Sequence, residues 1–75
     1  MNNTRRKELK KAAFLLGNIR FMIDSVRDAE EESYYNLPEG IQESERGMAM
    51  EDNVNSLETI SDDIDNIISD IESLI

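Results

Sequence analysis

Two heptad-spaced apolar runs, separated by the only proline of the chain, constrain the fold more than any other feature. In the first run the apolar residues are Leu9, Ala12, Leu16, Ile19, Ile23 and Val26. In the second run they are Leu57, Ile60, Ile64, Ile67, Ile71 and Leu74. Steps of three and four place side chains on one stripe of an α-helix, whereas the alternation of period two that indicates a strand fails. The sequence therefore predicts two amphipathic helices.

The segment between the two runs predicts a bend. Pro38 cannot continue a helix and disfavours helical geometry at the residue before it, so the first helix should end near Asn36. Gly40 permits a positive φ. Every residue type in this segment has a structural explanation, so the bend is the main interpretation. Recognition of a partner through Tyr35, Pro38, Glu39 and Gly40 is the second interpretation.

Helix-capping residues set the expected boundaries. Thr4 and Ser44 are both residue types that cap helix N-termini. A bend of this length lets the second helix return antiparallel, in a register that runs from Leu9 with Leu74 to Val26 with Leu57. The predicted fold is an all-α, antiparallel, coiled-coil-like hairpin. It forms a single domain over residues 1–75, with helices at about 4–35 and 44–75 and a hinge over 36–43.

Charge is distributed unevenly along the chain, whose net charge is -9. Residues 1–27 hold seven Lys and Arg against two acids, Glu8 and Asp24, whereas no base follows Arg46. Such asymmetry indicates either pairing between the two ends of the chain or a charged partner. The antiparallel register lays the basic N-terminal end beside the acidic C-terminal end. We therefore expect the two ends to neutralise each other.

Composition excludes most classes of chemistry. The chain has no cysteine and no histidine, which removes disulfides, thiolate metal sites, and the commonest general base. No run approaches the roughly 20 apolar residues that span a bilayer, and no Gly-rich phosphate loop is present. The stretch around Asp63 and Asp65 resembles a calcium loop only at two positions, since Ile67 and Ile68 stand where a ligand and a glycine are needed. We expect no catalytic, cofactor or metal site, no enzymatic activity, no membrane association, and a cytoplasmic location.

One hairpin leaves much of its apolar surface uncovered. A single seam of six aliphatic layers cannot offset the conformational entropy of ordering the chain, which is about 1.5 kcal/mol per residue. Further apolar residues lie beside the predicted seam, and they suggest an oligomer or partner interface: Phe14, Leu15, Phe21, Met22, Val54, Ile68 and Ile75. Self-association into a dimeric four-helix bundle is the favoured interpretation, because symmetric dimers are the commonest oligomers. A different protein, such as a host protein, covering the same face is the alternative.

The charged clusters suggest two kinds of partner. The basic cluster from Arg5 to Lys11 has the charge that attracts nucleic acid or anionic lipid, but the net charge and the acidic helix beside it argue against direct binding. The second helix presents an acidic face: Asp62, Asp63, Asp65, Asp70 and Glu72. Such a line of charge would fit the basic groove of a nucleic-acid-binding enzyme. The other interpretation is that these carboxylates only keep the protein soluble.

The segment NLPEGIQESERG, Asn36 to Gly47, resembles a hinge motif in small acidic helical-hairpin proteins of unknown function. These proteins come from phages, prophages and mobile elements of Gram-positive bacteria. The resemblance extends to the acidic stretch Glu30 to Tyr35 and to the heptads Val54 to Ile75, where Ile and Asp replace the usual Ala and Glu. It implies a helical hairpin and a phage context rather than a reaction. The expected function is a non-enzymatic interaction module that binds another macromolecule. The alternative is an acidic inhibitor of a host nucleic-acid-binding or defence enzyme that acts as a nucleic-acid mimic.

Overall fold

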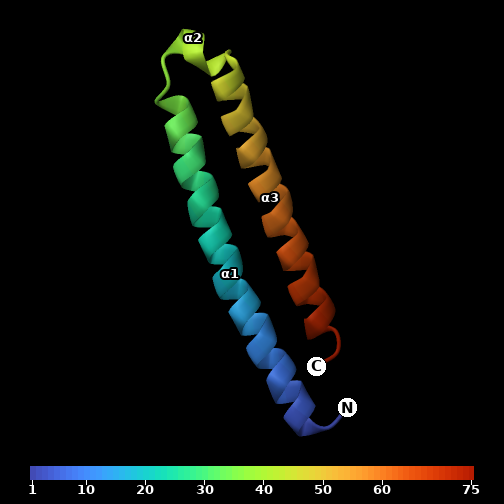
Figure 1. Cartoon of the computed structure of the whole chain (residues 1–75). Coiled ribbons are helices and arrows are strands. Elements are labelled where there is room, and N and C mark those ends of the chain that lie inside the picture. The colour runs from blue at the N-terminus through green and yellow to red at the C-terminus, as the bar shows by residue number, and fades with distance from the viewer.

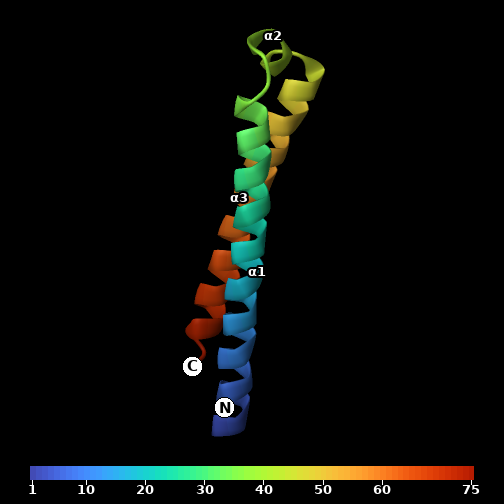
Figure 2. The ribbon, with the colours of Figure 1, turned by 90° about the vertical axis from the view of Figure 1, so that its left-hand side faces the viewer.

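The computed structural model describes all 75 residues as a helical hairpin (Figure 1). Its elements are α1 (Asn3–Tyr35), α2 (Glu39–Gln42) and α3 (Glu45–Glu72). The long helices α1 and α3 run antiparallel, so both chain ends lie at one end of the rod and α2 forms the opposite tip. The rod measures 59 × 14 × 11 Å. In the turned view of Figure 2 the two helices cross at a shallow angle, and the first turns of α1 extend beyond the end of α3.

Helix α1 begins and ends at polar residues. The N-cap is Asn2, whose side-chain oxygen accepts a hydrogen bond from the Arg5 amide at 2.8 Å. The prediction that Thr4 caps the helix was wrong, since Thr4 lies inside the first turn. The helix starts two residues earlier because Asn2 can accept a hydrogen bond from an unpaired amide of that turn. At the other end the Asn36 amide donates to the Glu32 carbonyl at 3.0 Å. The predicted end of the helix near Asn36 is confirmed.

The hinge ties the end of α1 to α2. Pro38 is the N-cap residue of α2, which places it where the chain cannot continue α1. The side-chain nitrogen of Gln42 lies 3.3–3.4 Å from the carbonyl oxygens of Tyr34, Tyr35 and Leu37. The Tyr34 and Tyr35 carbonyls belong to the last turn of α1, whose carbonyls lack a partner within a regular helix, although the Leu37 amide also donates to Tyr34 at 3.1 Å. Gln42 therefore caps the C-terminus of α1 from the next helix along the chain.

The start of α3 packs closely against the end of α2. Ser44 is its N-cap residue, as predicted, but its hydroxyl donates to the Ile41 carbonyl instead of accepting from the first turn of α3. Gly47 is buried, and a Cβ at this position would lie 2.1 Å from the Gln42 carbonyl oxygen. No glycine has a positive φ, Gly40 included. Close approach of two backbones, rather than an unusual conformation, therefore requires glycine at position 47.

The seam between α1 and α3 follows an uninterrupted heptad pattern on α3. Its inward-facing residues on α3 are Gly47, Met50, Val54, Leu57, Ser61, Ile64, Ile68 and Ile71. Those on α1 are less exposed than their neighbours and include Leu9, Ala13, Leu16, Arg20, Ile23, Arg27, Glu30 and Tyr34. Steps of three and four residues keep each stripe facing the other helix. Only Gly47, Val54 and Ser61 are buried.

The predicted stripes were only partly correct. Five residues assigned to the seam are 42–57% exposed instead: Ile19, Val26, Ile60, Ile67 and Leu74. Each helix is rotated about its axis relative to the prediction, so that Arg20, Arg27 and Ser61 take inward positions. The axial alignment agrees with the prediction. Asn53 donates to the Glu30 carboxylate at 3.1 Å, and this pair continues the predicted series from Val26 with Leu57.

Candidate functional site

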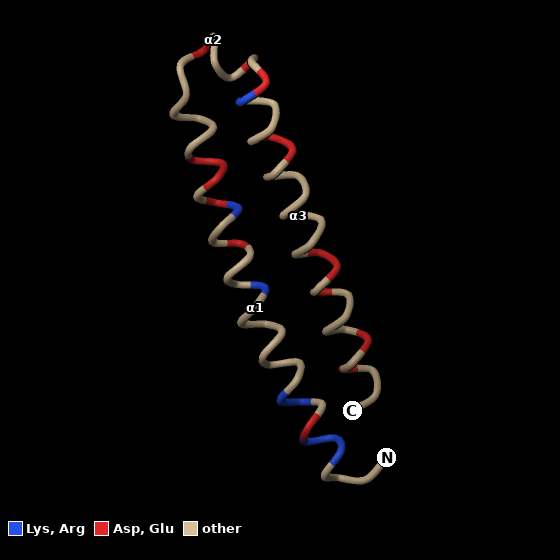
Figure 3. Tube along the Cα trace, viewed as in Figure 1, with Lys and Arg blue, Asp and Glu red and all other residues tan.

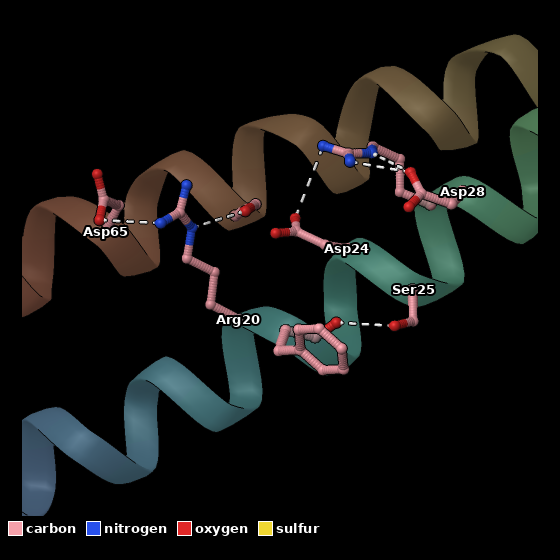
Figure 4. A network of polar contacts seen from close by, with 8 residues as sticks. Arg20, Asp24, Ser25, Asp28 and Asp65 are labelled. Carbon is pink, nitrogen blue, oxygen red and sulfur yellow. Dashed lines mark hydrogen bonds and ion pairs between the residues drawn. The ribbon is translucent and has the colours of Figure 1, made fainter.

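A polar layer lies in the middle of the seam (Figure 4). Arg20 donates from Nε to the Ser61 hydroxyl and from Nη1 to the Asp65 carboxylate, both at 3.1 Å. Ser61 is 3% exposed, so water has little access to its hydroxyl, and Arg20 supplies the hydrogen-bond partner. The ion pair with Asp65 is largely exposed and contributes little to stability by itself. This layer joins the two helices by polar contacts.

A second cluster of charges, centred on Arg27, lies about two turns further along α1. The Arg27 guanidinium contacts Asp28 at 2.9 Å and Asp24 at 3.6 Å (Figure 4). The hydrogen bond to Asp28, with further attraction from nearby carboxylates, raises the pKa of Arg27 above its already high ordinary value. Stability that a base gains in this way is lost only when the pH rises through that raised pKa. Arg27 therefore stays charged and adds no pH dependence in the physiological range.

The two long helices share one exposed apolar face. Its residues recur at heptad spacing on both helices, and we call this set the apolar face: Leu15, Ile19, Met22 and Val26 from α1, with Ile60, Ile67 and Leu74 from α3. The hydrogen bond between Glu30 and Asn53 shows that the two stripes border each other. Glu30 lies one turn after Val26, and Asn53 lies one heptad before Ile60. Both stripes therefore lie on the same side of the hairpin.

The predicted interface residues are divided among three places. Leu15 and Met22 belong to the apolar face. Phe14 and Phe21 are about 70% exposed, at 69% and 73%, and lie toward the opposite side of α1. Val54 is different, because it is buried inside the hairpin and is not available to a partner.

The remaining two predicted residues, Ile68 and Ile75, line a groove between the helices at the open end of the hairpin. The groove has a volume of about 660 Å³, and Phe14, Gly17, Lys10 and Glu72 complete much of its lining. It is wide open to solvent and contains no nucleophile paired with a base. No group of three or more carboxylates comes together in a way that would hold a metal ion. No helix combines the length and apolar character needed to cross a membrane.

Most Lys and Arg residues lie in the first turns of α1, whereas the charged residues of α3 after Arg46 are all acidic (Figure 3). All five residues of the predicted acidic face are exposed on α3, and Asp65 is the only one of them in an ion pair. The predicted pairing of the basic segment Arg5–Lys11 with this face does not form direct contacts. The three ion pairs of the structure involve only Arg20 and Arg27. The basic segment projects beside and beyond the end of α3, which leaves its cations without carboxylate partners (Figure 2).

The hinge residues have different environments. Tyr35, Pro38, Glu39 and Gly40 are all exposed at the tip, and the Tyr35 ring makes an edge contact with Tyr34 at 5.5 Å between centroids. Sequence reasoning did not identify the roles of Gln42, Gly47 and Arg20. The glycine and glutamine lie within the hinge motif itself. Arg20 lies one turn before Ile23 on the same side of α1, which is a signal that a search for apolar residues alone overlooks.

No protein-family model, curated protein or solved structure matches this chain.

Proposed function

We propose that this protein is a non-enzymatic interaction module that works by binding another macromolecule. The observation that carries the proposal is the apolar face, which both helices build and nothing in the hairpin covers. Soluble proteins rarely leave a large contiguous apolar patch exposed unless it is a binding surface. Val54 is the only buried apolar side chain of the hairpin, so a partner on the apolar face would supply much of the missing burial.

The middle of α1 supports this proposal. From Phe14 to Val26 every exposed residue is uncharged, because the two charged residues of this segment, Arg20 and Asp24, turn toward α3. An exposed helix surface without charges over this length is typical of a helix that packs against a partner on one side. On a helix that served only to solubilise the chain, charged residues would occupy these positions.

We further propose a phage-type accessory role in the cytoplasm of a bacterial host. This step is supported by the resemblance of Asn36–Gly47 to the hinge of phage and mobile-element proteins. The contacts of Gln42 and Gly47 give that motif a structural purpose, since one caps α1 and the other admits a close backbone contact. The hinge sequence therefore supports a shared hairpin architecture, while the binding surface lies on the rod.

Site-specific photocrosslinking in bacterial cells tests the proposed function. A photoreactive residue at Met22 or Ile67, on the apolar face, is expected to form covalent adducts with a macromolecule. The same residue at Ser25 or Thr59, which are exposed elsewhere on α1 and α3, serves as the matched control. Adducts from the face positions and none from the controls would support an interaction module. Absence of adducts at both face positions would contradict it.

The acidic face supports a second candidate function, inhibition of a host nucleic-acid-binding or defence enzyme. Every carboxylate of α3 is exposed, so the helix presents negative charge at intervals along its length (Figure 3). Such a line would enter a basic groove in place of a phosphate backbone. The test is competition with duplex DNA for that enzyme. Changing Asp62, Asp63 and Asp70 to Asn is expected to abolish competition by a mimic and to leave binding through the apolar face intact.

A further inference from the structure

We propose that a second copy of this chain covers the apolar face, with two hairpins packed face to face and their α2 tips at the same end. This inference rests on the proposed function, because it identifies the partner of the same face. It revises the interface expected from the sequence: Ile19, Val26, Ile60, Ile67 and Leu74 enter it, whereas Phe14 and Phe21 lie outside it.

The side of the hairpin that carries the apolar face fits a copy of the same rod, and the apolar face itself takes up about 20 Å of its length, from Leu15 to Val26 on α1 and from Ile60 to Leu74 on α3. The broad side of the hairpin, which carries the apolar face, measures 59 by 14 Å. Complete coverage of that side would bury roughly 800 Å² per copy, which is what a typical stable protein interface buries on each partner. A small ligand or a short peptide would leave most of this side exposed.

The pattern of the face fits helices as its cover. On α1 the stripe advances by four, three and four residues from Leu15 to Val26, and on α3 it advances by sevens from Ile60 to Leu74. This spacing keeps side chains aligned along a helix that packs against another helix. Because the two stripes lie largely at the same height along the rod, a rotation about its long axis sets each stripe against the other helix of the second copy. The product is a four-helix bundle with two-fold symmetry.

Charge selects the orientation of the two copies. With the α2 tips together, α1 of each copy lies over α3 of the other, and its basic segment Arg5–Lys11 comes close to Asp70 of the second copy. These cations have no ion-pair partner within the hairpin. With the tips at opposite ends, α1 would lie over α1 and its basic segment would come near the acids of Asp28–Glu32 of the second copy. In that arrangement, however, α3 would lie over α3 along its whole length, and its carboxylates would repel each other. Exposed charges add little affinity, but like-charge contacts exclude the wrong arrangement.

Sedimentation equilibrium of the purified chain tests the identity of the partner. The chain has a mass of 8.6 kDa, and we expect twice this mass for the wild-type protein at micromolar concentration. Ile19→Glu and Ile67→Glu each place a carboxylate in the apolar interface and are expected to raise the dimer Kd by at least ~100-fold. Phe21→Glu is the matched control, since it makes the same apolar-to-acid change on an exposed residue outside the face. It is expected to keep the dimer mass.

Three results would overturn the second-copy inference: a wild-type mass of one chain, a mass above two chains, or a dimer that survives both face substitutions. If the charged variants fail to fold, the wild-type protein still decides the matter. The Tm of a dimer that unfolds to separate chains rises with protein concentration, whereas the Tm of a monomer does not. A monomeric wild type that still forms adducts through Met22 or Ile67 would remove the second copy as partner and leave the proposed function standing.

A spin label at the α2 tip tests the orientation. The chain has no cysteine, and a Cβ at Gly40 meets no atom within 4 Å, so Gly40→Cys accepts a single label without disturbing the fold. Helices in a bundle pack 8–10 Å apart, so tips at the same end give a distance of roughly 20–30 Å between labels. Tips at opposite ends give a distance close to the 59 Å length of the rod. The longer distance would overturn the proposed arrangement.

Discussion

The two ends of the hairpin are built differently. At the α2 end, Gln42 caps α1, Gly47 packs against α2, and Val54 is buried between the long helices. At the open end none of residues 62–75 is fully buried, and no hydrogen bond joins residues 1–19 to α3. Contacts within one chain therefore specify the α2 end. The open end has exposed apolar surface and cations without ion-pair partners.

Gly47→Ala should have the largest effect on the free energy of unfolding. The new Cβ would lie 2.1 Å from the Gln42 carbonyl oxygen, so the α2 end must shift apart. We expect a loss of about 3 kcal/mol, measured by urea denaturation followed by circular dichroism at a fixed protein concentration. Gly40→Ala is the control, because its Cβ meets open space and should leave the stability unchanged or slightly higher. Equal stability of the two variants would show that the α2 end is not closely packed.

Arg20→Met should have the next largest effect, because it leaves the buried Ser61 hydroxyl without its side-chain donor. We expect a loss of about 1–2 kcal/mol in the free energy of unfolding. Adding Ser61→Ala to this variant should recover part of the loss, which a double-mutant cycle by thermal denaturation would measure. Asp65→Asn, which weakens only the exposed ion pair, should change stability by less than about 1 kcal/mol. Additive effects at Arg20 and Ser61 would indicate that the polar layer is not formed.

Gln42→Ala should destabilise the α2 end by about 1 kcal/mol, since the last carbonyls of α1 lose their side-chain donor. Hydrogen exchange should speed up in the last turn of α1 and in α2, and remain unchanged near Leu9. Glu43→Ala is the control, because that side chain is exposed and makes no hydrogen bond. Faster exchange along the whole of α1 would contradict the view that Gln42 acts locally.

Gly17→Ala should have the smallest effect and the opposite sign. Gly17 lies in the interior of α1 near the open end, and a Cβ there meets no atom within 4 Å. Alanine is the better helix former, so we expect a gain of up to about 1 kcal/mol in thermal denaturation. A loss of stability instead would show that another group packs against Gly17, which would contradict the open space around this residue.

The helices, the hinge and the axial alignment could be predicted from the sequence, because each depends on local signals. Pro38 marks the bend, and steps of three and four residues mark the helices. The rotation of the helices could not be predicted from apolar periodicity alone. The segment from Phe14 to Val26 is apolar on nearly every side, so two stripes fit equally well, one through Ile19 and one through Arg20. Polar contacts with α3 decide between them, and those contacts are long-range.

The existence of an uncovered apolar face could be predicted from the sequence, but most of its residues could not. A surplus of apolar residues indicated that some face is left uncovered, and Leu15 and Met22 do lie on that face. Which other residues join it depends on the same rotation, which turns Val54 inward and Ile60 and Ile67 outward. The role of Gln42 depends on how α2 folds back over the end of α1, and no heptad pattern contains that information.

The pairing of Arg20 with Ser61 also prevents the two helices from sliding past each other. A slip of one heptad would set Arg20 opposite Val54 or Ile68 in place of the small serine. Glu58 or Glu72 would then replace Asp65 as the ion-pair partner, but the guanidinium would lose its hydroxyl acceptor and meet a branched side chain. The aliphatic layers repeat and would tolerate several alignments, so the arginine–serine contact adds to the short hinge in holding the two helices at one alignment.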